Sequence, residues 1–504
     1  MRLFALCIML ATAASAQIVG SVRGIVHDPQ HRPVADAKIE LRAAHSQWAA
    51  HATSDQNGEF TCSPVPLGDY TIAVSHAGFA PALQMLAVAA GEAPILHLEL
   101  AVASQSQTTT VTAAAPVADV STATPTTTIN RLEVARTPGA DRANSLAMVT
   151  DFVPGATMVH DQLHVRGGHQ VSWLVDWVPV PNTNIASNVG PQFDPNDLDY
   201  LEIQRGSYDA QYGDRTYAVF NVVPRTGFER NREAELVVGA GSFFQTNDQF
   251  NFGSHTDRFA YYASLNGNRS NLGLATPAPQ VLHDADHGLG GFQSLIFNPD
   301  AQNQLRFVGS ERRDFYQIPN TPAQNAAAVH DAQRESDVFA EFSWVRTLAP
   351  SALLTLSPFY HYNRADYDGG ENDFPIATTD QRGSNYAGAQ ATLTAATGPS
   401  NFEAGFYGFH QHDEQLFALR FNDGTQPNLR QPESANGQLE EVFLEEKYQP
   451  WSWLTLMGGL RQSHFSAAFA ENATSPRIGA AIELPWLHWV ARGSYGRYYQ
   501  APPL

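Results

Sequence analysis

The stretch 197–225, DLDYLEIQRGSYDAQYGDRTYAVFNVVPR, determines how the rest of the chain is interpreted. Its first part, 198–203, carries the apolar residues of a short strand, and Arg205-Gly206 ends that strand. A second turn falls at Tyr212-Gly213, and a second strand follows in which the polar Asn221 interrupts an apolar run. The stretch has no glycine run that leads into a helix, as a phosphate-binding loop has. We therefore expect a strand, a turn and a strand, and no active site.

The order of these residues resembles the plug domain of TonB-dependent outer-membrane receptors. Two blocks upstream, LHVRGG at 163–168 and WLVDWVPV at 173–180, are similar to the R-G and L-x-D-G-x-P blocks of the same family. The residues that stand at the motif positions are Arg166, Gly167, Gly168, Asp176, Glu202, Arg205, Gly206, Tyr212, Gly213 and Asn221.

The resemblance implies that Arg166, Glu202 and Arg205 form an ionic latch between the plug and the wall of a barrel. The alternative is that they are surface charges on a strand. Two positions depart from the family pattern: Trp177 stands where the family has glycine, and Pro224-Arg225 replaces the usual Thr-Lys. These departures weaken any transfer of substrate identity from the family.

The composition excludes some classes of partner. The chain has 504 residues with 30 Lys and Arg against 50 Asp and Glu, a net charge of -20, which disfavours a nucleic-acid partner. Residues 1–16 combine Arg2, an apolar run and Ala14-Ser15-Ala16, a pattern that predicts a signal peptide. Cys7 lies within that peptide, so we expect no intrachain disulfide for Cys62. No later apolar run approaches the ~20 residues of a spanning helix, so a membrane crossing would be a barrel.

Residues 17–100 alternate short β-rich runs with turn residues, which predicts an Ig-like β-sandwich. Their pattern is similar to the carboxypeptidase regulatory-like domain, a module often found ahead of these receptors. The name implies no peptidase here, because the segment has no H-x-x-E zinc pair. Carbohydrate binding is sometimes inferred for this module, but we expect Trp48, Tyr70 and Phe79 to pack in the core or at its edge.

Residues 101–128 form a linker of Ser, Thr, Ala, Val and Pro that cannot bury a core. Within it, one segment resembles the TonB box, which a periplasmic energy-transducing partner binds by strand addition. Its residues are Thr109, Thr110, Val111, Thr112 and Ala113. A plain Thr-rich linker is the alternative, and the position ahead of a plug favours the TonB box. The plug is expected over 129–227, with a short helix at 142–153.

The pattern of residues 228–504 predicts an antiparallel transmembrane β-barrel, because polar and apolar residues alternate within segments of about ten residues. Thirteen strands are expected, at 232–243, 246–254, 257–268, 287–298, 301–313, 335–347, 351–363, 384–396, 400–412, 438–449, 452–464, 474–484 and 487–498.

The connections between these strands predict two different ends of the barrel. Every second connection is short, whereas the others are long and polar at 269–286, 314–334, 364–383 and 413–437. Short periplasmic turns and long external loops are typical of outer-membrane barrels. The tryptophans beside the short turns are placed for an interfacial aromatic girdle; they are Trp451, Trp453, Trp486 and Trp489.

The strand count leads to an expectation about the chain itself. A plugged transporter barrel has about 22 strands, and single-chain bacterial barrels have an even number. Thirteen strands would leave two open edges in lipid, so we expect an apparently incomplete barrel, and either a reading frame that continues past Leu504 or a product that is a non-functional fragment.

Three polar segments, 283–287, 366–373 and 410–414, carry His, Asp and Glu at spacings that metal ions use. All three fall in or beside expected external loops, and we interpret them as solvated acidic loops. No set of residues predicts a catalytic nucleophile with its base. We therefore expect neither an enzyme nor a cofactor.

The fold class is thus mainly β: an Ig-like β-sandwich, an α+β plug and a barrel. The resemblance implies a receptor in the cell outer membrane of a Gram-negative-type cell, with its N-terminal domain in the periplasm. Its function would be TonB-energised uptake of a scarce nutrient of siderophore, cobalamin or oligosaccharide type. The implied partners are a periplasmic TonB-type protein and outer-membrane lipid, with the barrel a monomer. The alternative is a surface-exposed or secreted carbohydrate-binding or adhesion protein without transport.

Overall fold

The computed structural model describes most of the chain after the expected signal peptide. The described residues are 19–28, 32–44, 46, 48–56, 58–66, 68–88, 95–100, 122–130, 134, 153–159, 162–168, 171–181, 193–213, 217–256, 258–274, 276–300, 302–349, 351–487 and 489–502. They fall into two units, 1–117 with 396–398 and the remainder from 118 onward, which are described separately. No helix in the described part of the chain has the length and apolar character needed to cross a membrane.

The first unit is a two-sheet β-sandwich, as the sequence predicts. One sheet has the order β4-β1-β7 and the other β3-β2-β5-β6. The strands are β1 (Val19–His27), β2 (Lys38–Ala43), β3 (Ala49–Thr53), β4 (Glu59–Pro66), β5 (Gly68–Ser75), β6 (Ala82–Val88) and β7 (Ile95–Glu99). Alternate residues of β2 point inward, so Ile39 and Leu41 are buried while the lysine before them is exposed.

The aromatic residues of this unit pack within it, as expected. The rings of Trp48 and Tyr70 meet edge to face with centroids 5.4 Å apart, and Tyr70 is buried. Phe79 packs partly buried against the same core. Cys62 is a buried free cysteine.

The plug is built on a five-stranded mixed sheet with the order β12-β11-β14-β13-β8. Its strands are β8 (Thr126–Asn130), β11 (Val171–Val175), β12 (Val178–Val180), β13 (Leu198–Gln204) and β14 (Ala218–Pro224), and a separate hairpin joins β9 (Ala156–Val159) to β10 (Gln162–Val165). The central strand β14 is buried along its whole length, and it pairs with β11 on one side and with β13 on the other. The helix expected at 142–153 lies outside the described residues except for its last position.

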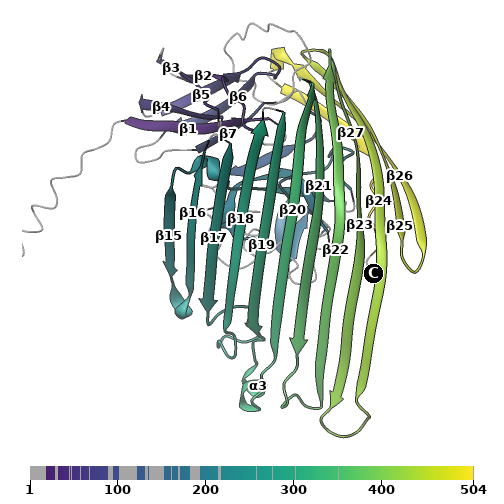
Figure 1. Cartoon of the computed structure of the whole chain (residues 1–504). Coiled ribbons are helices and arrows are strands. Elements are labelled where there is room, and N and C mark those ends of the chain that lie inside the picture. Colours follow the sequence, from purple (N-terminus) through teal and green to yellow (C-terminus); the bar gives the residue numbers. More distant parts are fainter. Residues whose placement is uncertain are drawn as a thin grey trace, which may run out of the picture. The chain divides into compact units, whose positions relative to one another are not determined.

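The wall of the second unit is one continuous antiparallel sheet of thirteen strands, in sequence order from β15 to β27 (Figure 1). All thirteen predicted strands are confirmed. They are β15 (Glu233–Ala240), β16 (Thr246–His255), β17 (Phe259–Ser270), β18 (Asp286–Asp300), β19 (Asn303–Gln317), β20 (Ala332–Ala349), β21 (Ala352–Asp368), β22 (Ile376–Thr397), β23 (Ser400–Phe421), β24 (Leu429–Trp451), β25 (Leu454–Ser466), β26 (Ala470–Leu484) and β27 (Trp489–Gly496).

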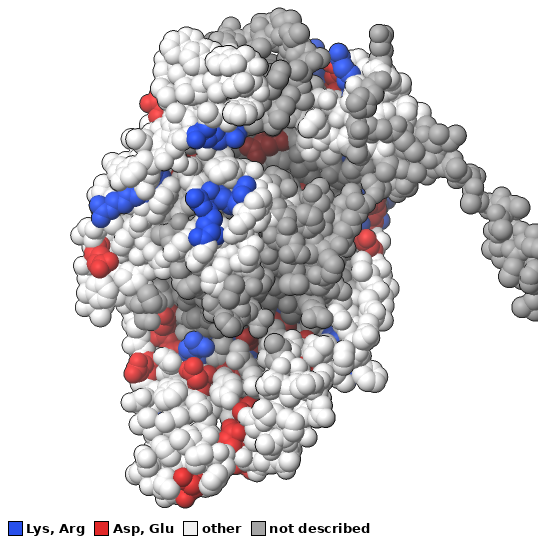
Figure 2. Space-filling view, turned by 180° about the vertical axis from the view of Figure 1, so that it is seen from behind, with Lys and Arg blue, Asp and Glu red and all other residues white. Residues whose placement is uncertain are grey.

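Polarity along these strands is the reverse of that in a soluble sheet. In β24 the buried side chains include Glu441 and Glu445, whereas Val442 and Leu444 between them are about half exposed. An exposed apolar face and a polar inner face are what a barrel in lipid requires. Figure 2 shows the side opposite to that of Figure 1, on which the charged side chains of the described residues lie in small separate groups.

The sequence prediction is wrong for two of the four long loops. Residues 364–383 and 413–437 are mostly strand, and the observed connections are only 369–375 and 422–428. The sequences of these segments are as polar as those of loops, although their backbones are paired with the neighbouring strands. The other connections expected to be long are shorter than predicted, at 271–285 and 318–331, and the second contains the helix α3 (Pro322–Ala326).

The opposite end of the wall has the short turns that the sequence predicts. Beside two of these turns the four tryptophans are exposed, and Trp451 stacks on Trp453 at 5.3 Å. Exposed indole rings at one level of a lipid-facing wall are typical of the membrane interface.

Candidate functional site: the seam between plug and wall

The motif turns of the plug require unusual backbone conformations. Gly206 ends β13 with a φ of 76°, and a Cβ there would lie 2.5 Å from the Nη1 atom of Arg166. Arg166 in turn donates from Nη1 to the carbonyl oxygen of Arg205 at 3.3 Å. The R-G pair is thus a tight turn against which the other motif arginine lies.

The L-x-D block forms the turn between β11 and β12. Asp176 and Trp177 both have positive φ, 50° and 70°, which explains why the family has glycine at the second position. In this chain the side-chain oxygen of Asn221 accepts the Trp177 N–H at 2.9 Å. The departure at Trp177 is therefore accommodated by a hydrogen bond from the neighbouring strand β14.

The side chain of Asp176 connects this turn to the wall. Its carboxylate forms an ion pair with Arg306 of β19, and both side chains are almost completely buried. Glu341 of β20 lies close enough to interact with the same pair and is also buried. Two carboxyl groups therefore compete for one guanidinium, and removal of that cation would leave both without compensation.

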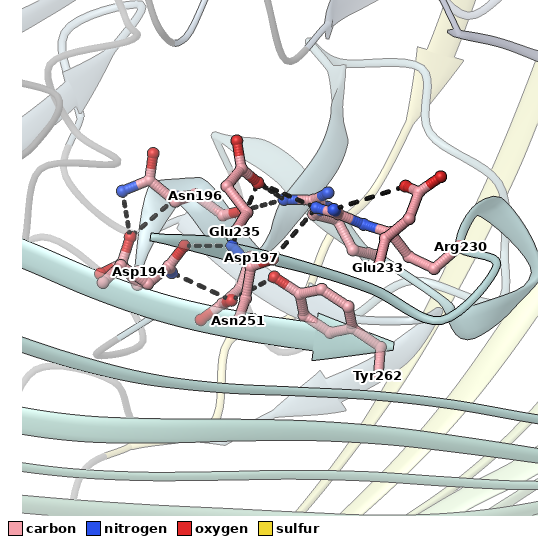
Figure 3. Close-up of polar contacts among 10 residues, drawn as sticks. Asp194, Asn196, Asp197, Arg230, Glu233, Glu235, Asn251 and Tyr262 are labelled. Atoms are coloured by element: carbon pink, nitrogen blue, oxygen red, sulfur yellow. Dashed lines mark hydrogen bonds and ion pairs between the residues drawn. The ribbon is translucent and has the colours of Figure 1, made fainter. Parts of the chain in front are cut away.

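A second attachment forms where the plug meets β15, β16 and β17 (Figure 3). The Asp197 carboxyl accepts hydrogen bonds from Gln249 Nε2 at 3.1 Å and from the Tyr262 hydroxyl at 3.0 Å. Arg230 donates from Nη2 to Glu235 at 2.9 Å and to Asn251 at 3.1 Å.

Arg225, the second departure from the family pattern, belongs to this attachment. Its guanidinium lies over the ring of Tyr262 at 5.0 Å and forms an ion pair with Glu235 at 3.5 Å. A planar guanidinium can stack and pair at once, which the ammonium of the family's lysine does less well. Pro224 before it stands at the last position of β14, where its missing N–H is tolerated.

The third attachment is the most extensive and holds the loop 208–212. Arg461 of β25 donates from Nη1 to the carbonyl oxygens of Ala210 at 3.0 Å and Gln211 at 2.7 Å. Arg477 of β26 donates to the carbonyl oxygens of Tyr208 at 3.0 Å and Tyr212 at 2.6 Å, and also to that of Asp209. We call these two arginines the arginine clamp.

The clamp is itself fixed by the wall. Glu441 of β24 accepts from Arg461 Nε at 2.9 Å, and Ser463 donates to the same carboxylate at 2.5 Å. The Arg477 guanidinium lies between the rings of Tyr208 and Tyr498, at 5.2 and 4.7 Å. These charge-assisted bonds lie in a buried site, where they are stronger than at a surface.

Beside the clamp lie a lysine and several carboxyl groups. Lys447 donates to the Asp209 carboxylate at 2.7 Å and lies 3.8 Å from Glu445. Glu445 also accepts the backbone N–H of Ala210. Glu202 faces this group from β13, and burial is the main reason that its pKa is raised to about 7.

The predicted latch residues lie in this seam, with partners other than those expected. Glu202 accepts from Gln204 at 3.2 Å and has no ion pair with Arg166 or Arg205 within the described residues. Arg205 donates instead to the Pro154 carbonyl at 3.1 Å and to Thr127 at 3.2 Å. Both guanidinium groups turn toward carbonyl and hydroxyl oxygens within the plug, and the ionic latch between plug and wall stays a prediction.

The remaining motif residues shape the plug. Gly168 packs against Tyr217 with no room for a Cβ, and Gly213 packs in the same way against Arg461. Gly167 has a φ of 88°, and Tyr212 is buried. The TonB-box residues 109–113 lie outside the described residues.

Sequence reasoning missed the partners on the wall: Arg306, Arg461 and Arg477, together with Asp197 and Asp209 of the plug. Inward-facing arginines in strands that otherwise alternate apolar and small residues were the available signal. Among the described residues no group of three or more His, Cys, Asp or Glu side chains is arranged to hold a metal ion.

Comparison with known proteins agrees with this architecture. Three family models match: the carboxypeptidase regulatory-like domain at residues 21–101, the TonB-dependent receptor plug domain at 118–219 and the TonB-dependent receptor-like β-barrel at 283–504. No curated protein sequence matches the chain.

Solved structures of similar fold include one uptake receptor and two transporters. The ferric yersiniabactin uptake receptor FyuA from Yersinia pestis is 14% identical with a TM-score of 0.58, over 72% of this chain and 62% of that one. The copper transporter OprC is 12% identical with a TM-score of 0.62, over 75% and 63%. The ferric citrate transporter FecA is 15% identical with a TM-score of 0.58, over 72% and 61%.

This chain thus spans a little over three fifths of the length of these receptors. The three matched models succeed one another along the sequence in the order module, plug and wall, and the structure has the plug attached to the inner face of that wall at three places. The chain therefore belongs to the TonB-dependent receptors of the cell outer membrane.

Proposed function

We propose that this receptor takes up a scarce nutrient across the outer membrane with energy from a periplasmic TonB-type partner. The observation that carries the proposal is the attachment of the plug by exchangeable polar contacts, not by an apolar core alone. Hydrogen bonds and ion pairs such as those of the arginine clamp can break and re-form as a plug moves. A permanently sealed wall would have no need of such contacts.

The partner would bind residues 109–113. Their β-branched side chains favour an extended backbone, and strand addition uses the free N–H and C=O groups of such a segment. This assignment puts the N-terminal module in the periplasm. It also predicts a monomeric barrel surrounded by lipid.

The ligand class is a siderophore, cobalamin or oligosaccharide type of nutrient. The solved structures of similar fold include receptors whose names refer to ferric yersiniabactin, copper and ferric citrate. We infer from this only that a scarce nutrient is the cargo.

The test begins with a panel of radiolabelled ferric siderophores, cobalamin and oligosaccharides, given to cells with and without the gene. The nutrient whose accumulation depends on the gene is then measured with Val111→Pro, which removes one N–H from the strand to be added. Val111→Thr is the matched control, because it keeps the N–H and the branched side chain.

We expect Val111→Pro to abolish accumulation while external binding of the same nutrient stays normal, and Val111→Thr to behave as wild type. Normal accumulation by Val111→Pro would refute the TonB-box assignment. If no nutrient in the panel depends on the gene, and the protein can be extracted from outer membranes with salt, an adhesion or carbohydrate-binding protein is the better reading.

A further inference from the structure

The carboxyl group of Asp197 is completely buried between the plug and strands β16 and β17 (Figure 3). It closes a single 3-10 turn, Pro195–Asp197, directly before β13. Its Oδ1 atom accepts both hydrogen bonds that come from the wall, from Gln249 and Tyr262. Its Oδ2 atom is buried and has no hydrogen-bond partner.

The charges around this carboxyl do not favour its ionised form. From its own loop the Asp194 carboxylate adds negative charge. From the end of β14 the Arg225 guanidinium lies over the Tyr262 ring and bonds to the Asn196 carbonyl oxygen at 3.4 Å and to Glu235.

The described part of the wall places no cation near the Asp197 carboxyl. Arg230 is bound to Glu233, Glu235 and Asn251, and the side chains that face Asp197 from β16 and β17 are neutral. No cation in the described part of the chain comes within ion-pair distance of Asp197. A buried carboxylate without a counter-ion is costly, whereas the neutral acid is not. Burial, with the Asp194 charge second, raises the pKa of Asp197 to about 8.

Ser264 offers a hydroxyl oxygen that could accept a hydrogen bond from a neutral acid. It lies two residues after Tyr262 on the same buried face of β17, and it faces the Asp197 carboxyl. Its hydroxyl oxygen is buried and, like Asp197 Oδ2, has no hydrogen-bond partner. A proton on Oδ2 would satisfy both atoms, because a protonated carboxyl donates where a carboxylate can only accept.

We infer that Asp197 is a neutral carboxylic acid in the seated plug and that it donates a hydrogen bond to Ser264 of the wall. The attachment of the plug at β16 and β17 is therefore a proton-dependent contact. This inference is independent of the proposed uptake, since it concerns only how the plug is held. It assigns Asp197 as a positioning residue of the plug.

The pH dependence follows from the sign of the shift. The seated carboxyl binds its proton more tightly than a solvated one, whose ordinary pKa is 3.8. The contribution of this contact is therefore full in acid, falls as the pH rises from about 4 to about 8, and does not return above that range.

Infrared difference spectroscopy tests the assignment directly. The full-length receptor in outer-membrane vesicles is compared with Asp197→Asn, which keeps the shape of the side chain and cannot ionise. Asp300→Asn is the matched control, because Asp300 is the exposed last residue of β18 and its carboxylate accepts hydrogen bonds from Asn303.

At about pH 6, wild type minus Asp197→Asn should show the carbonyl stretch of a protonated carboxylic acid, and this band should disappear as the pH is raised through about 8. Wild type minus Asp300→Asn should show only carboxylate bands. Ser264→Ala should keep the acid band and shift it to higher frequency, whereas Ser264→Thr, which keeps the hydroxyl, should restore its position. Carboxylate bands alone in the Asp197→Asn difference, or a band that Ser264→Ala does not shift, would overturn the inference.

Discussion

Arg477 on β26 donates a hydrogen bond to the backbone carbonyl oxygen of Tyr212 at 2.6 Å, across the seam between wall and plug. The acceptor is main chain, so the contact depends on the conformation of the loop 208–212 and not on its side chains. Because Arg461 holds the same loop in the same way, the wall recognises a backbone shape. The consequences for plug stability can be measured.

The clamp should be the strongest of the three attachments. Arg477→Met removes several hydrogen bonds from a buried cation, and each such bond contributes ~1.5–3 kcal/mol. We expect hydrogen exchange in 206–213 to be faster by about 10-fold or more. Arg313→Met, at an exposed arginine of β19, should leave this exchange unchanged. Equal protection in both variants would show that the clamp contributes little.

Replacing Arg306 should destabilise the plug more than replacing its partner Asp176. Arg306→Met leaves Asp176 and Glu341 buried without a cation, whereas Asp176→Asn leaves Arg306 beside Glu341. We expect the first to destabilise the seated plug by ~3–5 kcal/mol and the second by much less.

Denaturant unfolding of the receptor in detergent, followed by protease sensitivity of the plug, measures this difference. Arg306→Lys, which keeps the charge, is the conservative control for both variants. If Asp176→Asn proved as harmful as Arg306→Met, Glu341 would have no part in the pair.

Glu202 should make the stability of the plug depend on pH. Its pKa is raised to about 7 from an ordinary 4.5, so the seated plug binds a proton more tightly than the unfolded one. Stability from this group is therefore full below about pH 4.5 and is lost as the pH rises to about 7.

Glu202→Gln should remove that part of the pH dependence and leave a plug at least as stable as wild type at pH 8. The measurement is protection of 198–204 from hydrogen exchange at several pH values, after correction for the intrinsic rate. Loss of protection in Glu202→Gln at pH 8 would indicate that the ionised carboxylate is needed, as a latch with arginines would require.

Asn221 should be required for the stability of the turn that contains Trp177. Its side-chain oxygen accepts the Trp177 N–H in a turn that a residue other than glycine adopts at a cost. Asn221→Leu leaves the partly buried Trp177 N–H without this acceptor, which costs up to ~1–3 kcal/mol. Asn221→Asp keeps an oxygen at the same place, so with the carboxyl protonated at low pH it should be milder. Thermal unfolding of the two variants at acid pH decides between them.

Much of the fold could be predicted because side chains alternate along a strand in lipid. Phe259 and Tyr261 face outward while Tyr262 and Ser264 face inward, as their order in the sequence indicates. Strand ends were less predictable. Around Asp380 the residues are polar on both faces, so the sequence has the composition of a loop although the backbone is paired with β21.

The site was predictable in its plug half only. The motif identified where Asp176 and Glu202 stand, but not what they contact, since partners such as Arg306 come from strands far along the chain. The motif includes Tyr212 on the plug side but could not predict the clamp, because the acceptors between Tyr208 and Tyr212 are carbonyl groups that every residue has.

The length of the strands β22 to β24 determines where variation in this receptor can act. At ~3.4 Å per residue, strands of 22 or 23 residues extend ~75 Å, whereas the apolar band of such a wall is ~25 Å tall. More than half of each strand thus stands in water as rigid sheet, joined by connections of seven residues. An antibody or a phage that docks on this side would meet a stiff, ordered epitope. Natural variants that an antibody or phage no longer binds should carry substitutions of single residues on these strands, since an insertion would change the register of the pairing.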